Sequence, residues 1–282
     1  MAPREQARYW EHPGLPGVDL LRARYVRHTF PRHAHDTYVI AAVTGGVEGI
    51  GLPGGPERAG AGGVVLINPE TPHSAYAGVE DGWSYRVLYP SPAVVAAVAA
   101  ETRALRGTPS FTASVLDDPA TAGMIADVHR AAEQDNALAA DTLLRLVVAR
   151  LLARHGAPAA VGPAPAGGAA VAARARDLLA TRLVDPPSLE ELARETGTGS
   201  FALLRAFKAA YGLPPHAWLT GERVRAAKRL LDAGVTPADT AATVGFTDQP
   251  HLNRHFTRIV GVPPGAYRRE RKNVQDRPPA GP

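Results

Sequence analysis

The hydrophobic positions of this chain follow a strand-like pattern first and a helical pattern later. Between residues 18 and 90, short apolar runs such as Tyr38–Val43 and Val64–Ile67 alternate with stretches rich in Gly and Pro, which is typical of strands joined by tight turns. Within Trp83–Tyr89, the aromatic and apolar side chains at odd-numbered positions share one face of a strand. The pattern predicts a small β-barrel or sandwich in the N-terminal part.

Residues 119–155 change to a helical period rich in Ala, Leu and Val. Leu144, Val147 and Leu151 occur at i, i+3 and i+7, so they form one apolar face of a helix. Periodicity does not say what such a face touches. It either packs on the barrel or pairs with a second subunit, so a homodimer is one of the expected assemblies.

A segment made only of Ala, Gly, Pro and Val follows at residues 157–170. Such a composition offers almost no side chain that could hold a fold, and it is typical of a semi-rigid linker. It therefore predicts two domains, at residues 1–156 and 171–282.

The second domain contains a repeat with an offset of 49 residues. Each copy reads as a short helix, a tight turn and a second helix ending at Gly-x-Pro-Pro, which is the layout of a helix-turn-helix unit. A single unit of this kind could be a plain corner between helices, but its repetition favours an all-α domain that places two helices in DNA. The repeated residues are Leu203, Arg205, Phe207, Gly212, Pro214, Pro215 and Ala217 with Leu252, Arg254, Phe256, Gly261, Pro263, Pro264 and Ala266, and Ala193 with Ala242.

In the first copy, Ser188 and Glu191 have the spacing of a capping box, and Gly197 permits the sharp turn. The second helix of this copy is expected over about residues 200–211. In the second copy, residues 236–244 form the first helix. A helical pattern at about residues 215–233 connects the two copies, with a length of roughly 27 Å at ~1.5 Å per residue.

The side chains that face outward on the second helix of each copy are the candidates for contact with DNA. Arg, Asn and Gln can make bidentate contacts to base edges, and Lys can neutralise a phosphate. Either Thr247 or Asp248 is expected to cap the second of these helices. The candidate DNA-binding residues are Phe201, Leu204, Arg205, Lys208, Gln249, His251, Asn253, Arg254 and Arg258.

The charge of the chain agrees with this division, although it would not carry the DNA assignment alone. Residues 171–282 hold 17 Lys and Arg against 11 Asp and Glu, whereas residues 1–170 hold 14 against 16. The chain has no cysteine, which excludes disulfides, thiolate metal sites and cysteine nucleophiles. It also lacks a signal-peptide pattern and a membrane-spanning run, so we expect a cytoplasmic protein that does not engage a membrane.

The C-terminal motifs resemble the AraC/XylS family of bacterial transcription regulators. The resemblance covers about residues 171–269 and rests on Ser188–Ala193, Gly245–Gln249 and Phe256–Arg268. It implies a seven-helix module whose two recognition helices occupy successive major grooves, and an activator that contacts RNA polymerase. Leu204 departs from the polar residues usual at its position. Similar modules also occur in DNA-repair alkyl acceptors, but these need a thiol, which this chain lacks.

The N-terminal part resembles the cupin-type sensor domain that precedes such modules. The resemblance rests on His33-Ala-His35, Tyr38, His73 and the strand Trp83–Tyr89. It implies that a small organic effector binds in the barrel and controls binding to double-stranded DNA. The candidate effector-binding residues are His33, His35, Tyr38, His73, Trp83 and Arg86, with Arg22, Arg24 and Tyr85 as further pocket residues.

Three histidines could also form a metal site, because neutral imidazole binds Zn, Fe, Ni and Cu. Two departures from the pattern of metal-binding cupins argue against a metal site. Val39 or Ile40 stands where those proteins place a glutamate, and His73 follows the proline one residue earlier than in that pattern. We therefore expect no metal, no cofactor and no catalytic residue. The alternatives are a cupin metalloenzyme or metal sensor tethered to DNA, and an architectural DNA binder without an effector.

Overall fold

The structure is a computed structural model that describes residues 5–102, 105, 107–159 and 167–275. The chain divides into two compact units. The first, here called the N-terminal unit, holds residues 1–30, 34–160 and 269–282, and the second, the C-terminal unit, holds residues 31–33 and 161–268.

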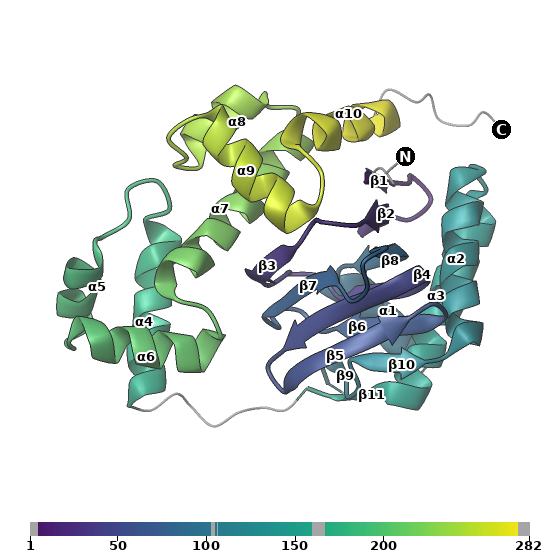
Figure 1. The fold of residues 1–282 in the computed structure, drawn as a ribbon, viewed down its shortest axis with the longest axis horizontal. Helices are drawn as coiled ribbons and strands as arrows, with labels where there is room; N and C mark the ends of the chain where they lie inside the picture. The colour runs from purple at the N-terminus through teal and green to yellow at the C-terminus, as the bar shows by residue number, and fades with distance from the viewer. Residues whose placement is uncertain (1–4, 103–104, 106, 160–166, 276–282) are drawn as a thin grey trace. The chain divides into compact units, whose positions relative to one another are not determined.

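The N-terminal part of the chain is built from β-strands (Figure 1). The strands are β1 Gln6–Glu11, β2 Val18–Tyr25, β3 Phe30–His33, β4 Val39–Leu52, β5 Gly55–Gly60, β6 Gly63–Ile67, β7 His73–Ala77, β8 Trp83–Pro90, β9 Pro109–Phe111, β10 Val115–Asp117 and β11 Gly156–Pro158. The larger sheet runs in the order β1-β2-β8-β4-β6-β10, with β3, β5 and β7 attached to it, and its main pairings are antiparallel. The β-structure predicted for the N-terminal part is confirmed, and its strands are antiparallel.

Three helices of the N-terminal part cover one face of the sheet. They are α1 Pro92–Thr102, α2 Pro119–Glu133 and α3 Ala137–His155. Ile40 and Leu88 of the sheet pack in one buried core with Ile125 of α2 and Val147 of α3. Leu144 and Leu151 lie in the same core. The apolar face predicted for residues 144–151 therefore packs within its own unit.

The opposite face of the sheet is aromatic, as the alternation in β8 predicts. Tyr25, Trp83 and Tyr85 are all buried, and the ring centroids of Trp83 and Tyr85 lie 5.9 Å apart. β4 bends at an irregularity between Val43 and Gly45 where it pairs with β8. Gly46 is required at this bend, because a Cβ there would lie 2.0 Å from the carbonyl oxygen of Gly82.

The predicted linker is narrower than residues 157–170 at both ends. Ala157 and Pro158 belong to β11, which pairs with β9. At the other end α4 already begins at Gly168. Residues 160–166 lie outside the described part of the chain.

The C-terminal helices follow the predicted order of two helix-turn-helix motifs joined by a long helix (Figure 1). They are α4 Gly168–Thr181, α5 Leu189–Glu195, α6 Ser200–Tyr211, α7 Pro215–Asp232, α8 Pro237–Thr243, α9 Gln249–Val260 and α10 Pro264–Gln275. The bounds predicted for α6 and α7 are confirmed within one residue. Along the described residues, no helix is both long and apolar enough to span a membrane.

The repeat is not strictly one of 49 residues, because the second turn is one residue longer than the first. Four residues separate α5 from α6 and five separate α8 from α9. Ala193 is buried in the first motif, whereas its predicted counterpart Ala242 is exposed and Ala241 is buried instead. The pairing of Ala193 with Ala242 was therefore wrong by one residue.

Candidate DNA interface and effector site

The first helix-turn-helix motif comprises α5 and α6. The Ser188 hydroxyl accepts a hydrogen bond from the Glu191 backbone N–H at 3.2 Å, and the Glu191 carboxylate accepts one from the Ser188 N–H at 2.8 Å, which confirms the capping box. Gly197 in the turn has φ 70°, and Gly212 ends α6 with φ 66°. Leu203 and Phe207 are buried, so the opposite side of α6 faces away from the core.

The second motif, α8 and α9, ends its recognition helix in the same way, since Gly261 has φ 87°. Its start differs. The Asp248 carboxylate accepts a hydrogen bond from the His251 N–H at 2.6 Å, whereas the N-cap of α6, Gly199, has no side chain to do this. Asp248, and not Thr247, is therefore the cap.

Most predicted DNA-contacting side chains are exposed. Phe201 is 79% exposed, which is unusual for a large apolar side chain and leaves its ring available to a partner. In the part of the chain that the structure describes, Arg205 and Arg254 make no ion pair or side-chain hydrogen bond. The exposed members are Phe201, Arg205, Lys208, Gln249, Arg254 and Arg258, and the half-buried ones are Leu204, His251 and Asn253.

His251 lies beside two aromatic rings, one from the turn before α9 and one from α9 itself. Its ring lies 5.2 Å from that of Phe246 and 4.8 Å from that of His255. Burial lowers the pKa of His255, and the nearby charge of His251 adds to this effect. The sequence analysis did not name His255 as a site residue, because its position next to buried Phe256 places it at the edge of the outward face of α9.

α7 joins the two motifs into one unit. Leu219 packs in the core of the first motif, and Val224, Ala227 and Leu231 are buried further along the helix. The Arg223 guanidinium donates a hydrogen bond to the Leu183 carbonyl at 2.8 Å. With 18 residues, α7 is about 27 Å long at ~1.5 Å per residue.

The three candidate histidines of the N-terminal part lie together. His33, His35 and His73 each offer a ligand atom within 4.8 Å of the others. The Nδ1 atoms of His33 and His73 bond to the carbonyls of Pro31 at 2.7 Å and Thr71 at 2.9 Å. Metal-binding histidines are commonly oriented by such backbone bonds, so the arrangement is chemically able to hold a metal.

The other candidate effector residues do not join this cluster. Tyr38 is buried and donates a hydrogen bond to the Pro109 carbonyl at 2.5 Å. Trp83 lies six residues along β8 from Tyr89, whose ring is 5.4 Å from that of His35. Roughly 20 Å of strand, at ~3.4 Å per residue, therefore separates Trp83 from the residue of β8 that lies beside His35. The six predicted residues therefore do not line one pocket.

Arg86 lies on the other face of β8 and is grouped with Arg22 and Arg24 around an open cleft. The cross-strand register explains this grouping, because Arg22 of β2 pairs with Arg86 and Arg24 pairs with Ser84. The sequence pattern grouped these arginines with the aromatic residues Tyr38, Trp83 and Tyr85, and of the three only Tyr85 is among the residues that line this cleft.

Glu48 is a buried acidic residue that the sequence analysis did not single out. Burial raises the pKa of its carboxyl group from 4.5 to about 8, and its Oε2 has no hydrogen-bond partner among the residues described. Burial and nearby polar groups, including Glu48, also raise the pKa of Tyr85. Glu48 was missed because the apolar run ends at Val43, whereas β4 continues to Leu52.

Comparison with known proteins links each part of the chain to a family. Residues 15–148 match the AraC-like ligand binding domain, and residues 192–270 match a helix-turn-helix domain. YbfI of Bacillus subtilis strain 168, described as an uncharacterized HTH-type transcriptional regulator, is 25% identical over 83% of this chain and 86% of its own length.

The chain is also similar to the regulator VirF in sequence and to ToxT in structure. VirF of Yersinia enterocolitica, a virulence regulon transcriptional activator, is 32% identical over 28% of this chain and 30% of its own length. The crystal structure of ToxT from Vibrio cholerae O395 covers 96% of this chain and 99% of its own, with a TM-score of 0.53 and 10% identity. The ToxT likeness shows a shared two-domain fold.

Proposed function

Because the chain belongs to the AraC family of transcription regulators, we propose that it reads specific DNA sequences and responds to a small molecule bound in its N-terminal unit. The observation that carries this proposal is the pair of recognition helices α6 and α9. Each has a buried apolar face and an outer face carrying an exposed arginine, Arg205 or Arg254, that has no ion-pair partner among the residues described. A helix that enters the major groove needs an exposed outer face of this kind.

The two recognition helices enter successive major grooves of one duplex. Their separation is set by α7, whose length of about 27 Å is of the same order as one turn of DNA, about 34 Å. Arg205 and Arg254 fork to base edges, while Lys208 and Arg258 neutralise phosphates. Phe201 and Leu204 supply apolar contact, for which a thymine methyl group is the matching surface.

The protein acts as a regulator and not as an enzyme, and we propose that it activates transcription by contact with RNA polymerase. The likeness of its helix-turn-helix part to the activator VirF supports the sign of regulation. A homodimer remains part of the proposal, although the α3 face first considered for it is buried within the unit.

Substitution of Arg254 tests base reading. Arg254→Ala is expected to weaken binding at the preferred site by about 1–3 kcal/mol and to relax the choice of base there, because a forked contact to a guanine edge is lost. Lys208→Ala serves as the matched control. This variant is expected to bind all DNA sequences more weakly to the same extent. The slope of the logarithm of the binding constant against the logarithm of the salt concentration should become smaller by about one unit. Selection of bound sequences from a random pool, followed by titrations at several salt concentrations, measures both effects.

An equal loss on specific and random DNA for Arg254→Ala would remove Arg254 from the base-reading residues. Failure of the unaltered protein to select any sequence, with and without a panel of metabolites, would contradict the proposed function itself.

The histidine cluster supports a second candidate, a regulator that responds to a metal ion. Three imidazole ligand atoms within 4.8 Å of one another favour it, whereas the missing glutamate favours an organic effector. Metal analysis of the purified full chain separates the two. Stoichiometric transition metal whose removal abolishes regulation selects the metal sensor, and regulation that persists through chelation selects the organic effector.

A further inference from the structure

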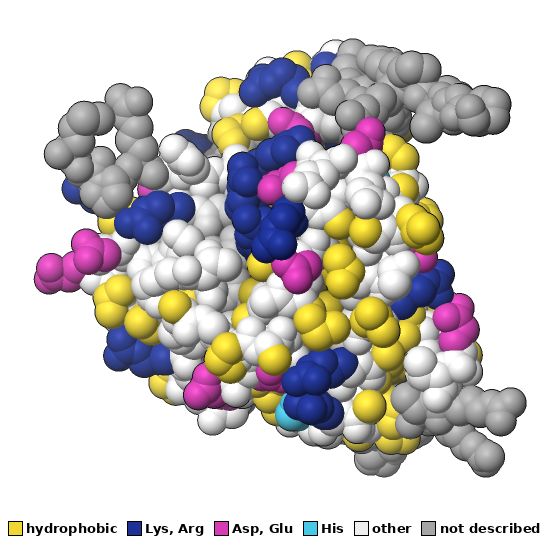
Figure 2. All heavy atoms as spheres, turned by 90° about the vertical axis from the view of Figure 1, so that its right-hand side faces the viewer, with side chains coloured by type: hydrophobic (Ala, Val, Ile, Leu, Met, Phe, Trp, Pro, Cys, Tyr) yellow, Lys and Arg dark blue, Asp and Glu magenta, His cyan; other side chains and the backbone are white. Residues whose placement is uncertain are grey.

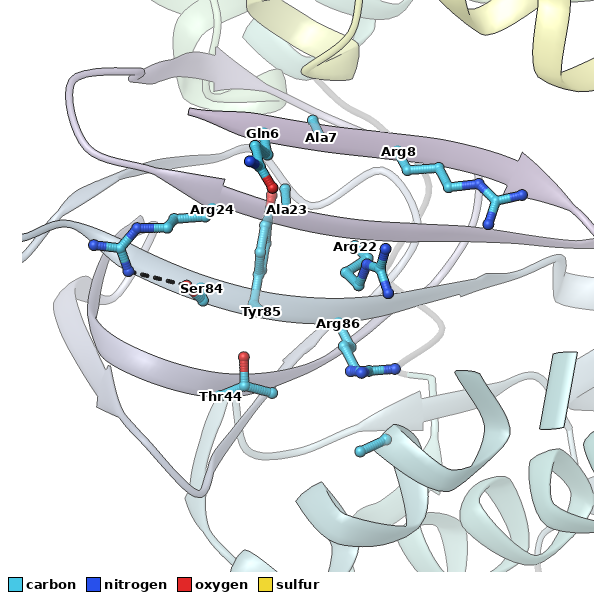
Figure 3. A pocket seen from close by; sticks show the side chains of 11 residues that line it. Gln6, Ala7, Arg8, Arg22, Ala23, Arg24, Thr44, Ser84, Tyr85 and Arg86 are labelled. Carbon is cyan, nitrogen blue, oxygen red and sulfur yellow. Dashed lines mark hydrogen bonds between the residues drawn. The ribbon is translucent and has the colours of Figure 1, made fainter. Parts of the chain in front are cut away.

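The cleft that contains Arg86 has the charge of an anion-binding site. It is open, has a volume of about 580 Å³ and lies over strands β1, β2 and β8 (Figure 3), and Ala126 of α2 contributes to its lining. Among the described residues that line it are Arg8, Arg22, Arg24 and Arg86, and none of the lining residues is acidic. Its volume is within the range of small-molecule sites, roughly 300–1,000 Å³.

The sheet register concentrates the positive charge. Arg8 of β1 pairs with Arg22 of β2, which in turn pairs with Arg86 of β8, so three arginines form a row across neighbouring strands. Neighbouring strands are about 4.8 Å apart, and like charges directly opposite each other destabilise a sheet. Figure 3 shows Arg22 and Arg86 rising from adjacent strands into the same space, with Arg24 hydrogen-bonded to Ser84 further along the cleft.

One carboxylate of the unit itself lies between two of these arginines. Glu133, the last residue of α2, accepts a hydrogen bond from Arg22 Nη1 through Oε1 at 2.7 Å, and its Oε2 is 3.8 Å from Arg86 Nη1. Arg8 is separately bonded to Glu270. Figure 2 shows that acidic side chains lie next to the most prominent group of basic side chains on that side of the molecule.

Glu133 leaves the cluster incompletely neutralised. The distance of 3.8 Å to Arg86 is too long for a hydrogen bond, and Arg86 Nη1 is inaccessible to solvent without any hydrogen-bond partner among the residues described. A buried donor in this state carries a desolvation cost that a suitably placed oxyanion removes. The excess positive charge also reaches His129 of α2, because burial and then the charge of Arg86 lower the pKa of His129 to about 3.

We propose that this cleft binds the carboxylate or phosphate group of the small-molecule effector, and that Glu133 occupies the same guanidinium groups when the effector is absent. A planar guanidinium group presents paired N–H donors that match two oxygens of a carboxylate or phosphate better than lysine or a neutral donor does, and here two such groups are adjacent. The inference rests on the proposed function, since it names the chemical class of the ligand that regulates the protein. It places the charged end of that ligand on the helix-covered face of the sheet, away from the histidine cluster.

Calorimetric titration of the full chain tests this assignment with matched pairs of probes. Benzoate is compared with benzamide, and glucose 6-phosphate with glucose, so that the members of each pair differ mainly in their anionic group. The anionic member of at least one pair is expected to bind and its neutral partner not to bind. The pair that responds distinguishes a carboxylate from a phosphate ligand.

Three substitutions then locate the binding. Arg86→Gln is expected to weaken binding of the anionic probe by about tenfold, because a charge-assisted hydrogen bond is lost. The matched control Arg130→Gln removes the same charge from an exposed position of α2 and is expected to leave the affinity unchanged. Glu133→Gln is expected to strengthen binding several-fold, because it removes the internal competitor. A purely structural role of Glu133 would not produce this increase.

Equal binding of charged and neutral probes, or no binding of any probe up to about 10 mM, overturns the assignment. An affinity for the anionic probe that is unchanged or weaker in Glu133→Gln also overturns the assignment. This variant gives a decisive result even if Arg86→Gln fails to fold. DNA binding measured on the same preparations separates the anion site from the proposed function. A protein that selects DNA but discriminates no anion refutes only the anion site, whereas one that binds anions without selecting DNA refutes the proposed function.

Discussion

Glu48 places a carboxyl group in the interior of the β-structure, beside residues that are mostly apolar or aromatic. It is 4% exposed, and its raised pKa of about 8 follows from burial alone. The indole Nε1 of Trp83 is likewise buried without a hydrogen-bond partner in the described part of the chain. Buried groups of this kind lower stability unless a partner satisfies them.

Replacing Glu48 by its neutral isostere is expected to change the pH dependence of folding. In the folded state the carboxyl group keeps its proton up to about pH 8, whereas in the unfolded chain it loses it near pH 4.5. Wild-type stability should therefore fall by roughly 1 kcal/mol per pH unit between these two values and not below them. Glu48→Gln should abolish this decline, which urea unfolding at pH 5 and pH 8.5 measures.

Glu57→Gln provides the control, because Glu57 is an exposed carboxylate on the neighbouring strand β5. The same stability difference between wild type and Glu48→Gln at both pH values would show that Glu48 does not hold a proton in the fold.

For single residues, the sequence predicts which side chains of a helix are exposed better than it predicts which side chains line a pocket. Arg205 and Arg254 are exposed as expected, because helical spacing fixes the side of a residue relative to buried Phe207 and Phe256. The effector residues were grouped by chemical type, but their positions depend on register and strand length. Trp83 and Arg86 are three residues apart in β8 and therefore point to opposite faces of the sheet.

The two recognition helices differ at their N-caps. The N-cap of α9, Asp248, accepts a hydrogen bond through its side chain, whereas the N-cap of α6, Gly199, has no side chain that could do so. Substituting Asp248→Ala is expected to destabilise the chain by about 1 kcal/mol, and Gly199→Ser to stabilise it by a few tenths of a kcal/mol, because glycine is itself a tolerable N-cap. Gly199 has φ −83°, and a Cβ added there meets nothing within 4 Å, so serine fits without strain. Thermal and urea unfolding measure both changes.

Gly197→Ser is the control for the second substitution. Gly197 has φ 70°, which a serine adopts at a cost, so this variant should be less stable than wild type. A stabilisation by Gly197→Ser, or a loss of stability in Gly199→Ser, would contradict the capping explanation.

The helical elements were more predictable than the strands because their boundaries have local chemical causes. Ser188 with Glu191, Gly212 and Gly261 start or stop helices by contacts within a few residues. Beyond Gly46, β4 continues through Gly-rich sequence to Leu52 because it pairs with β5, the next strand, and with β7, which lies much further along the chain. A local pattern does not contain the pairing with β7.

For the whole molecule, we propose that the Ala/Gly/Pro segment separates an effector-binding part from a DNA-binding part. Limited proteolysis with a protease of broad specificity is expected to cut between residues 159 and 167, since the composition there offers almost no side chain to bury. The C-terminal product should fold and bind DNA without effector, which circular dichroism and a gel-shift titration check. An uncut linker, or a product that does not fold, would contradict this division.

The single helix α7 carries core residues of both helix-turn-helix motifs, and this makes their separation resistant to gradual change. Each residue added to an α-helix advances its axis by about 1.5 Å but also rotates every later residue by about 100°. Loss or gain of one residue in α7 would therefore turn one recognition helix away from the side of the duplex that the other faces. An alteration of the spacing between recognised base pairs has to arise through changes in the surface residues of α6 and α9. From its composition of Ala, Gly, Pro and Val, we expect the segment between β11 and α4 to tolerate insertions far better.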